Sequence, residues 1–137
     1  MTQIEKQLLL KDIAARVPYG VKCQTKNGIG TLISIECSFG ENLAYVDFGH
    51  PEVEEYDLND GDTVKPYLRP MSSMTEEEKN ELGNFVAAEM FASQSKDPLF
   101  QLTRKALFAD FFNKHHIDYR GFIEDGFALE AKEGMYE

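Results

Sequence analysis

The sequence predicts an α+β fold: an N-terminal helix, a small curled antiparallel β module, and a C-terminal helical segment. Two observations carry this prediction. Short alternating runs separated by turn residues fill residues 21–68, whereas helical periodicity dominates from Thr75 onward. About five short strands joined by tight turns suit an SH3-like barrel better than a β-sandwich. The helical segment contains two long helices and one short helix.

The stretch VKPYLRPMSSMTEEE, residues 64–78, joins the β half to the helical half. Its apolar residues belong to the last strand, and Thr75 fixes the start of the next helix, so only residues 70–74 are left to flex. We therefore expect one fused domain over residues 1–137, made of residues 1–70 and 71–137. Tyr67 and Leu68 should be buried where the two halves meet.

The first helix is predicted over residues 3–16. Thr2 and Glu5 have the spacing of a capping box, in which each side chain bonds the backbone of the other residue. Pro18 disfavours helix at the residue before it and so ends the element. The apolar positions that fall on one face are Leu9, Leu10, Ile13, Ala14 and Val17.

Five strands are expected at residues 21–25, 30–36, 43–49, 53–58 and 63–68. Asn27 and Gly28 tolerate positive φ, which suits a tight hairpin between the first two strands. The fourth strand is charged, as is typical of a sheet edge. Pro66 lacks an amide donor, so the fifth strand should lie on an edge or end early.

Two long helices are predicted at residues 76–93 and 98–116, and residues 119–125 form a short third helix that Asp118 caps. Thr75 and Glu78 repeat the capping-box spacing at the first of these. The 98–116 helix is apolar over most of its circumference, which is typical of a helix packed between other elements or at a subunit interface.

The net charge of −10 is spread over both halves. No cluster of Lys and Arg is present to neutralise phosphates, so direct nucleic-acid binding is not expected. Solubility is the ordinary explanation of the charge, and mimicry of DNA is the alternative. Without a signal peptide or an apolar run of about 20 residues, the chain is expected to be cytoplasmic and to have no membrane contact.

The sequence contains no recognisable phosphate-binding loop, zinc motif or nucleophile elbow, so no catalytic residue, resident metal or cofactor is assigned. His115, His116 and Asp118 are weak candidates for metal binding or acid–base chemistry. Adjacent helical residues point about 100° apart, so a structural role is the competing interpretation. Cys23 and Cys37 lie in apolar strand patterns, which favours reduced, buried thiols over nucleophiles.

Four residues are candidates for contact with a partner. Tyr56 lies in a charged strand and is the best candidate for an exposed ring among the strand aromatics; such rings grip extended or cationic peptides. Glu89 falls on the apolar face of its helix, where an ion pair is the competing interpretation. Phe108 and Phe112 lie on the broadly apolar 98–116 helix.

Three blocks of the chain resemble a family of uncharacterised short proteins from Bacteroides-type gut bacteria and their phages or prophages. The blocks are MTQIEKQLLLKDIAARVPYGV, VKPYLRPMSSMTEEE and NKHHIDYRGFIEDGFALEAKEGMY, which together cover roughly half of the chain. The resemblance implies a bacterial or phage origin and a cytoplasmic setting. It implies no activity and carries over no catalytic residue.

These observations predict a non-enzymatic accessory or adaptor protein that binds a protein partner or its own copy. One alternative is an acidic DNA mimic or a subunit of a nucleic-acid-processing complex. Another is a small metal-dependent or cysteine hydrolase that uses the histidines, Asp118 or a cysteine.

Overall fold

The computed structural model describes residues 2–38, 40–49, 52–59, 64–92 and 98–137, with side chains described except at residue 38 and within residues 85–92 and 99–105. The elements follow in the order α1 (Gln3–Arg16), β1 (Lys22–Thr25), β2 (Gly28–Ser38), β3 (Glu41–Asp47), β4 (Glu54–Asp57), β5 (Val64–Leu68), α2 (Glu76–Ala92), α3 (Pro98–Lys114), α4 (Phe122–Asp125) and β6 (Leu129–Glu130). Two short 3-10 turns, Val17–Tyr19 and Met71–Ser73, follow α1 and β5. The α+β class is confirmed.

The six strands form one sheet in the order β4-β3-β2-β1-β5-β6. All pairs are antiparallel except β5 with β6, which run parallel through Tyr67–Leu129 and Leu68–Glu130. The Asn27-Gly28 turn joins β1 to β2 as predicted, with Gly28 at φ 120°. A register shift between Leu32 and Ser34 makes Ile33 a bulge residue.

The sheet is open, because β4 and β6 lie at its two ends, so closure into an SH3-like barrel is not confirmed. The prediction that Pro66 places its strand at an edge is wrong. β5 lies inside the sheet, between β1 and β6. Pro66 is tolerated there because β6 pairs only with the two residues that follow it, and the proline therefore needs no amide donor on that side.

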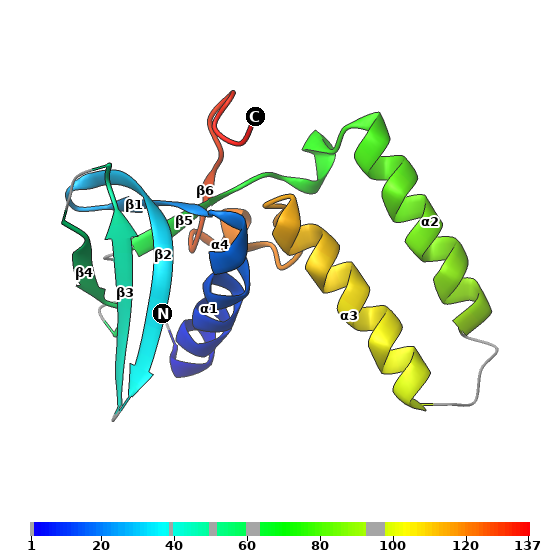
Figure 1. Cartoon of the computed structure of the whole chain (residues 1–137), viewed down its shortest axis with the longest axis horizontal. Coiled ribbons are helices and arrows are strands. Elements are labelled where there is room, and N and C mark those ends of the chain that lie inside the picture. The colour runs from blue at the N-terminus through cyan, green and yellow to red at the C-terminus, as the bar shows by residue number, and fades with distance from the viewer. Residues whose placement is uncertain (1, 39, 50–51, 60–63, 93–97) are drawn as a thin grey trace.

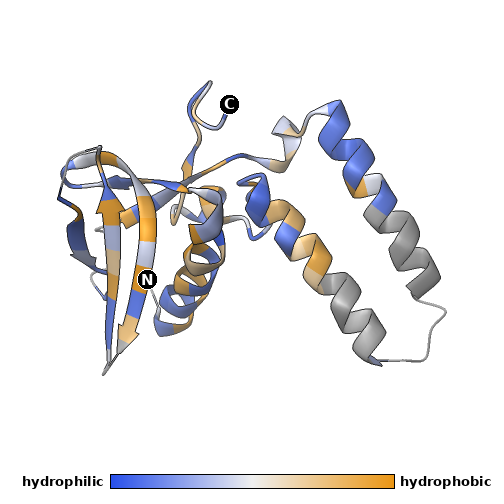
Figure 2. Cartoon of the chain, in the orientation of Figure 1, coloured by the Kyte–Doolittle hydropathy of each residue, from blue (hydrophilic) through white to orange (hydrophobic). Residues whose placement is uncertain are grey.

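The hydrophobic core lies between α1 and the face of the sheet that it covers (Figure 1). Figure 2 shows apolar residues on α1 and on the sheet, and hydrophilic residues at the start of α2. Tyr67 and Leu68 are 4% and 0% exposed, which confirms their predicted burial. The buried residues of the core are Leu9, Ile13, Val21, Cys23, Leu32, Ala44, Val46, Tyr56, Val64, Leu68, Phe122 and Ala128.

Both predicted capping boxes are present. Thr2 Oγ1 accepts from Glu5 N at 3.1 Å, and Thr2 N donates to Glu5 Oε2 at 2.6 Å. Thr75 Oγ1 accepts from Glu78 N at 3.2 Å, and Thr75 N donates to Glu78 Oε1 at 2.8 Å. These local bonds fix where α1 and α2 begin, as the sequence predicts.

Helices α2 and α3 lie side by side as a hairpin that extends away from the sheet (Figure 1). We call this hairpin the helical arm. Its base is the start of α2 and the end of α3, and there it meets α1 and the segment after β5. How the base is joined to the body therefore decides where the arm points.

Candidate functional site at the base of the arm

Two segments that the sequence singles out lie side by side at the base of the arm. The residue after β5, Arg69, forms a parallel bridge with Ile117. Arg69 N donates to His116 O at 2.7 Å, and Asp118 N donates to Arg69 O at 2.8 Å. The segment after β5 and the segment after α3 thus run side by side. Because they are far apart in the sequence, a local sequence pattern does not predict this pairing.

Glu78 is the residue on which the side chains at this junction converge. Arg69 binds its carboxylate with two nitrogens, at 2.8 and 2.7 Å, and His115 Nδ1 lies 3.0 Å from Glu78 Oε2. The Arg69 guanidinium holds the pKa of Glu78 down at about 2, despite partial desolvation of the carboxyl. Glu78 is therefore a fixed anion that ties β5, α2 and α3 to one another.

A cleft of about 510 Å³ opens between this junction and the C-terminal segment. Its walls carry more carboxylates than cations, and most of the charged groups are exposed. The hydroxyls of Ser73 and Thr75 are engaged in their own turns, with Pro70 O and Glu78 N. A ligand in the cleft would therefore meet charged side chains, and neither the Ser73 nor the Thr75 hydroxyl is activated as a nucleophile. The charged residues on its walls are Arg69, Glu77, Glu78, His115, Glu130, Lys132, Glu133 and Glu137.

The three residues of HHIDYR proposed for metal or acid–base chemistry face different neighbours. His115 contacts Glu78, and its Nε2 lies 3.4 Å from Glu81 Oε2, within ion-pair range but not aligned for a hydrogen bond. Asp118 accepts from Phe122 N and Ile123 N, both at 2.9 Å, so it bonds the first amides of α4 as predicted. The predicted start of this helix at residue 119 is wrong, because α4 begins at Phe122 with Gly121 as its N-cap residue. Among the described residues, no group of three or more His, Cys, Asp or Glu is placed to hold a metal.

His116 ends α3 in the left-handed conformation, with φ 59°. Its N donates to Asn113 O and Ile117 N donates to Phe112 O, the bond pair of a Schellman motif, where glycine is the usual residue. The imidazole stacks on Tyr136, with ring centroids 3.7 Å apart. Burial lowers the pKa of His116 to about 4, with positive neighbours adding to the effect. His116 is therefore a neutral packing residue near neutral pH.

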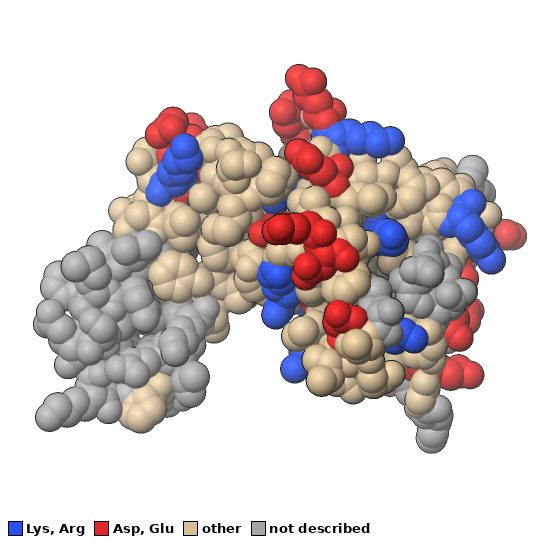
Figure 3. All heavy atoms as spheres, turned by 180° about the vertical axis from the view of Figure 1, so that it is seen from behind, with Lys and Arg blue, Asp and Glu red and all other residues tan. Residues whose placement is uncertain are grey.

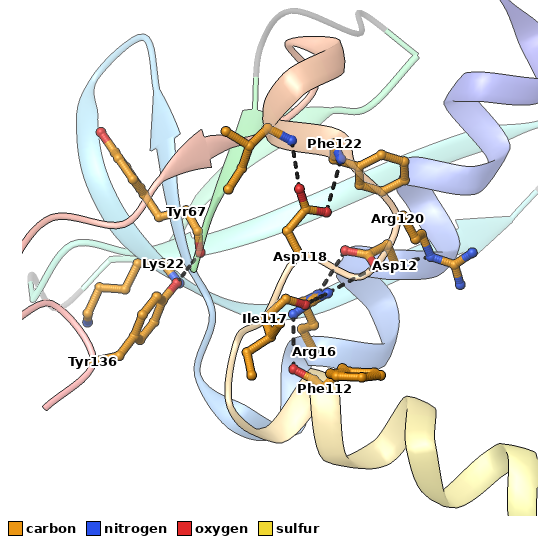
Figure 4. A network of polar contacts seen from close by, with 11 residues as sticks. Asp12, Arg16, Lys22, Tyr67, Phe112, Ile117, Asp118, Arg120, Phe122 and Tyr136 are labelled. Atoms are coloured by element: carbon orange, nitrogen blue, oxygen red, sulfur yellow. Dashed lines mark hydrogen bonds and ion pairs between the residues drawn. The ribbon is translucent and has the colours of Figure 1, made fainter. Parts of the chain in front are cut away.

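The C-terminal segment is held down by Tyr136. Its hydroxyl accepts from Lys22 N at 2.9 Å and donates to Tyr67 O at 2.6 Å (Figure 4). Burial raises the pKa of this phenol. The hydroxyl thus bridges β1 and β5, and Tyr136 is one of the residues that line the cleft.

A buried ion-pair network connects α1 with the segment after α3 (Figure 4). Asp12 and Arg16 are fully buried and pair at 2.8 Å; Arg16 also donates to Ile117 O at 2.8 Å, and Arg120 pairs with Asp12 at 3.2 Å. Sequence reasoning missed this network. The available signal was the four-residue spacing of Asp12 and Arg16 on the helix face that carries Leu9 and Ile13.

The prediction that Tyr56 is an exposed ring is wrong, because Tyr56 is 3% exposed. Its ring points into the core and meets Phe48 edge-on at 6.4 Å, while its hydroxyl donates to Glu54 at 2.6 Å. The charged residues around it lie on the opposite face or at the end of the strand. Strand alternation, applied from Ala44 and Val46 across β3, places Tyr56 inward and Tyr45 outward.

Of the remaining partner-contact candidates, Phe108 and Phe112 are half-buried on α3. Phe112 stacks on Tyr119 at 5.4 Å and therefore belongs partly to the base of the arm. The side chain of Glu89 lies outside the described residues.

The two cysteines differ in environment. Cys23 is buried in β1, and burial raises the pKa of its thiol to about 12, so it is a poor nucleophile. Cys37 is exposed on β2, contrary to the prediction that both thiols are buried. The reason is that the long β2 strand extends beyond the area that α1 covers (Figure 1).

No protein-family model, no curated protein and no solved structure matches this chain. The resemblance to the Bacteroides-type family stays a prediction. None of the helices in the described part of the chain is long and apolar enough to cross a membrane.

On the face shown in Figure 3, Lys and Arg lie among the carboxylates. A DNA mimic requires an uninterrupted acidic face, and this view does not favour one. The cysteine hydrolase alternative requires an activated thiol, and burial raises the pKa of the Cys23 thiol to about 12.

Proposed function

We propose that the protein is a non-enzymatic accessory protein that acts through protein–protein contact, with the helical arm as the contacting element and a second copy of the chain as its first partner. The observation that carries this proposal is the extension of α2 and α3 away from the sheet (Figure 1). A hairpin held mainly at its base leaves the surface along its length to another molecule.

The amino-acid content of α3 supports the same conclusion. Its sequence, PLFQLTRKALFADFFNK, is apolar over most of its circumference. α2 lies on one side of α3, and the described residues of α1 contact α3 near the C-terminal end of α3, where Arg16 Nη1 is 3.5 Å from Phe112 O. An apolar helix with neighbours on part of its surface is stabilised by further packing.

A second copy of the chain carries the same apolar helix and can therefore supply a matching surface. Two hairpins placed against each other form a four-helix bundle, a common way for paired amphipathic helices to bury their apolar sides. A twofold arrangement also closes on itself, which limits the assembly to a dimer.

Size-exclusion chromatography with light scattering tests this proposal on the full chain. We expect the mass of a dimer. The variant Phe108→Glu should be a monomer with unchanged helix content by circular dichroism, because a carboxylate at an apolar interface is costly to bury. Ile33→Glu is the matched control: Ile33 is an apolar residue, 44% exposed on the sheet, and its variant should stay dimeric. A wild-type monomer at high concentration would overturn self-association through the arm.

A further inference from the structure

Strand β4 forms one end of the sheet, and its outer edge faces away from β3. Leu58 N donates to Asn42 O at 2.7 Å, next to the paired residues Ala44–Tyr56 and Val46–Glu54. Bonding alternates along an antiparallel ladder, so the backbone groups that point toward β3 belong to residues 54, 56 and 58. The N–H and C=O groups of Glu55 and Asp57 consequently point outward.

The exposed face beside this edge carries a phenol ring among carboxylates. Tyr45 lies opposite Glu55 across β3 and β4, and its hydroxyl donates to Glu36 of β2 at 2.9 Å. The hydrogen bond to Glu36 raises the pKa of Tyr45, and the charges of Glu36 and Glu55 add to the shift. Asp57 lies opposite Leu43 on the same face. Tyr45 is thus an aromatic residue on the outward face of the strands, the position that the sequence predicted for Tyr56.

Charge on an edge strand ordinarily prevents pairing with other strands. Here the sign is uniform: Glu54, Glu55 and Asp57 are all acidic. A second copy of β4 placed against this edge would bring carboxylates together, which is unfavourable. A strand that carries cations would instead bring opposite charges together, which is favourable. The edge therefore discriminates between partners by charge.

We infer that the β4 edge accepts an extended, basic segment of a partner protein as an added strand. The segment has Lys or Arg at alternate positions, opposite Glu55 and Asp57 on the exposed face, where cross-strand side chains lie within about 5.5 Å. Main-chain bonds to Glu55 and Asp57 supply the pairing, and the cations supply the selectivity. The Tyr45 ring lies one strand further in, within reach of a long cationic side chain. This surface is separate from the helical arm, so its occupancy does not depend on dimerisation.

The experiment titrates the isotopically labelled full chain with an end-blocked peptide of alternating Lys and Val, followed by amide NMR. We expect shifts centred on β4 and slower hydrogen exchange of the Glu55 and Asp57 amides. An analogue with N-methyl groups on the peptide bonds that face β4 keeps the charge but cannot pair. It should bind about tenfold more weakly or worse, because two or more main-chain bonds are lost.

Charge is tested with Glu55→Lys, which should weaken binding of the Lys–Val peptide about tenfold by exchanging attraction for repulsion. Asp57 is left intact because it also accepts from Asn59 N. Glu124→Lys on α4 makes the same change of charge at an exposed site elsewhere and should alter binding less than about twofold. A dispersed spectrum identifies folded variants.

Three results would overturn the inference. They are equal binding of the N-methylated analogue, equal weakening by Glu55→Lys and Glu124→Lys, and no binding up to the solubility limit of the peptide. A monomeric protein that still binds the peptide would overturn the proposed dimer but support this inference. A dimer that does not bind the peptide would support the proposed dimer but overturn this inference.

Discussion

Replacing Glu78 by Gln tests whether the junction holds the arm through a single carboxylate. The substitution keeps the size of the side chain and an acceptor for Thr75 N, but it removes the charge that faces Arg69 and His115. Arg69 is then left partly buried without its anion. We expect lower stability at neutral pH and a changed dependence on pH.

The magnitude follows from the pKa of Glu78. A fall from 4.5 to about 2 in the folded state corresponds to about 3 kcal/mol of favourable interaction with the ionised form. Because the carboxylate borders an open cleft, solvent screening reduces the expected loss in Glu78→Gln to about 2 kcal/mol. The folded pKa is the depressed one, so the contribution is complete above pH 4.5 and is lost as the pH falls toward about 2.

Urea unfolding followed by circular dichroism, at neutral pH and in steps down to pH 2, measures this contribution. The difference between the wild type and Glu78→Gln should shrink as the pH falls below 4.5. Glu77→Gln removes an exposed carboxylate from the same helical turn and should cost about 0.5 kcal/mol at most. A difference that stays constant with pH, or matches that of Glu77→Gln, would refute the reasoning.

Three further predictions concern stability and use thermal unfolding as the measurement. Gly30→Ala should lower the free energy of unfolding by about 2 kcal/mol, because its Cβ would lie 2.5 Å from a side-chain carbon of Val46. Gly83→Ala on α2, where a Cβ would meet open space, should raise the free energy of unfolding by about 0.5–1 kcal/mol. The opposite order of stability would contradict this prediction. Asp12→Asn should cost about 3 kcal/mol by leaving buried Arg16 unpaired, and a loss below about 1 kcal/mol would show that the network is dispensable. Tyr136→Phe should cost about 1–2 kcal/mol by removing both bonds of the hydroxyl while keeping the ring, and an unchanged melting temperature would count against the bridge.

The features that the sequence predicts correctly are those that local chemistry determines. Helix α1 covers the predicted residues, and both Thr–Glu capping boxes form. Asp118 bonds the first two amides of α4 because an acceptor near the start of a helix satisfies its free N–H groups. The burial of Tyr67 and Leu68 follows from the short distance between the last strand and the Thr75 box.

The features that the sequence does not predict depend on contacts between distant segments. No local pattern pairs Arg69 with Ile117, or brings Arg69, Glu78 and His115 together. The interior position of β5 depends on β6, a strand of two residues that periodicity cannot detect. The burial of Tyr56 has another origin: the charge of its strand suggests exposure, but the alternation of the strand decides which face is buried.

The nature of the junction sets a consequence for the arm. The body is held by an apolar core, whereas at the base of the arm the ionic and polar contacts around Glu78 add to the packing of buried Phe111. Ionic contacts that border solvent weaken with salt and low pH, and apolar packing does not weaken in the same way. The arm should therefore detach before the body unfolds, and the protection factors of the amides in the first turns of α2 should fall at low pH while those of the β2 and β3 amides stay high. This order of stability would serve the proposed adaptor function, because an arm that contacts a partner could change its direction without loss of the fold that carries it.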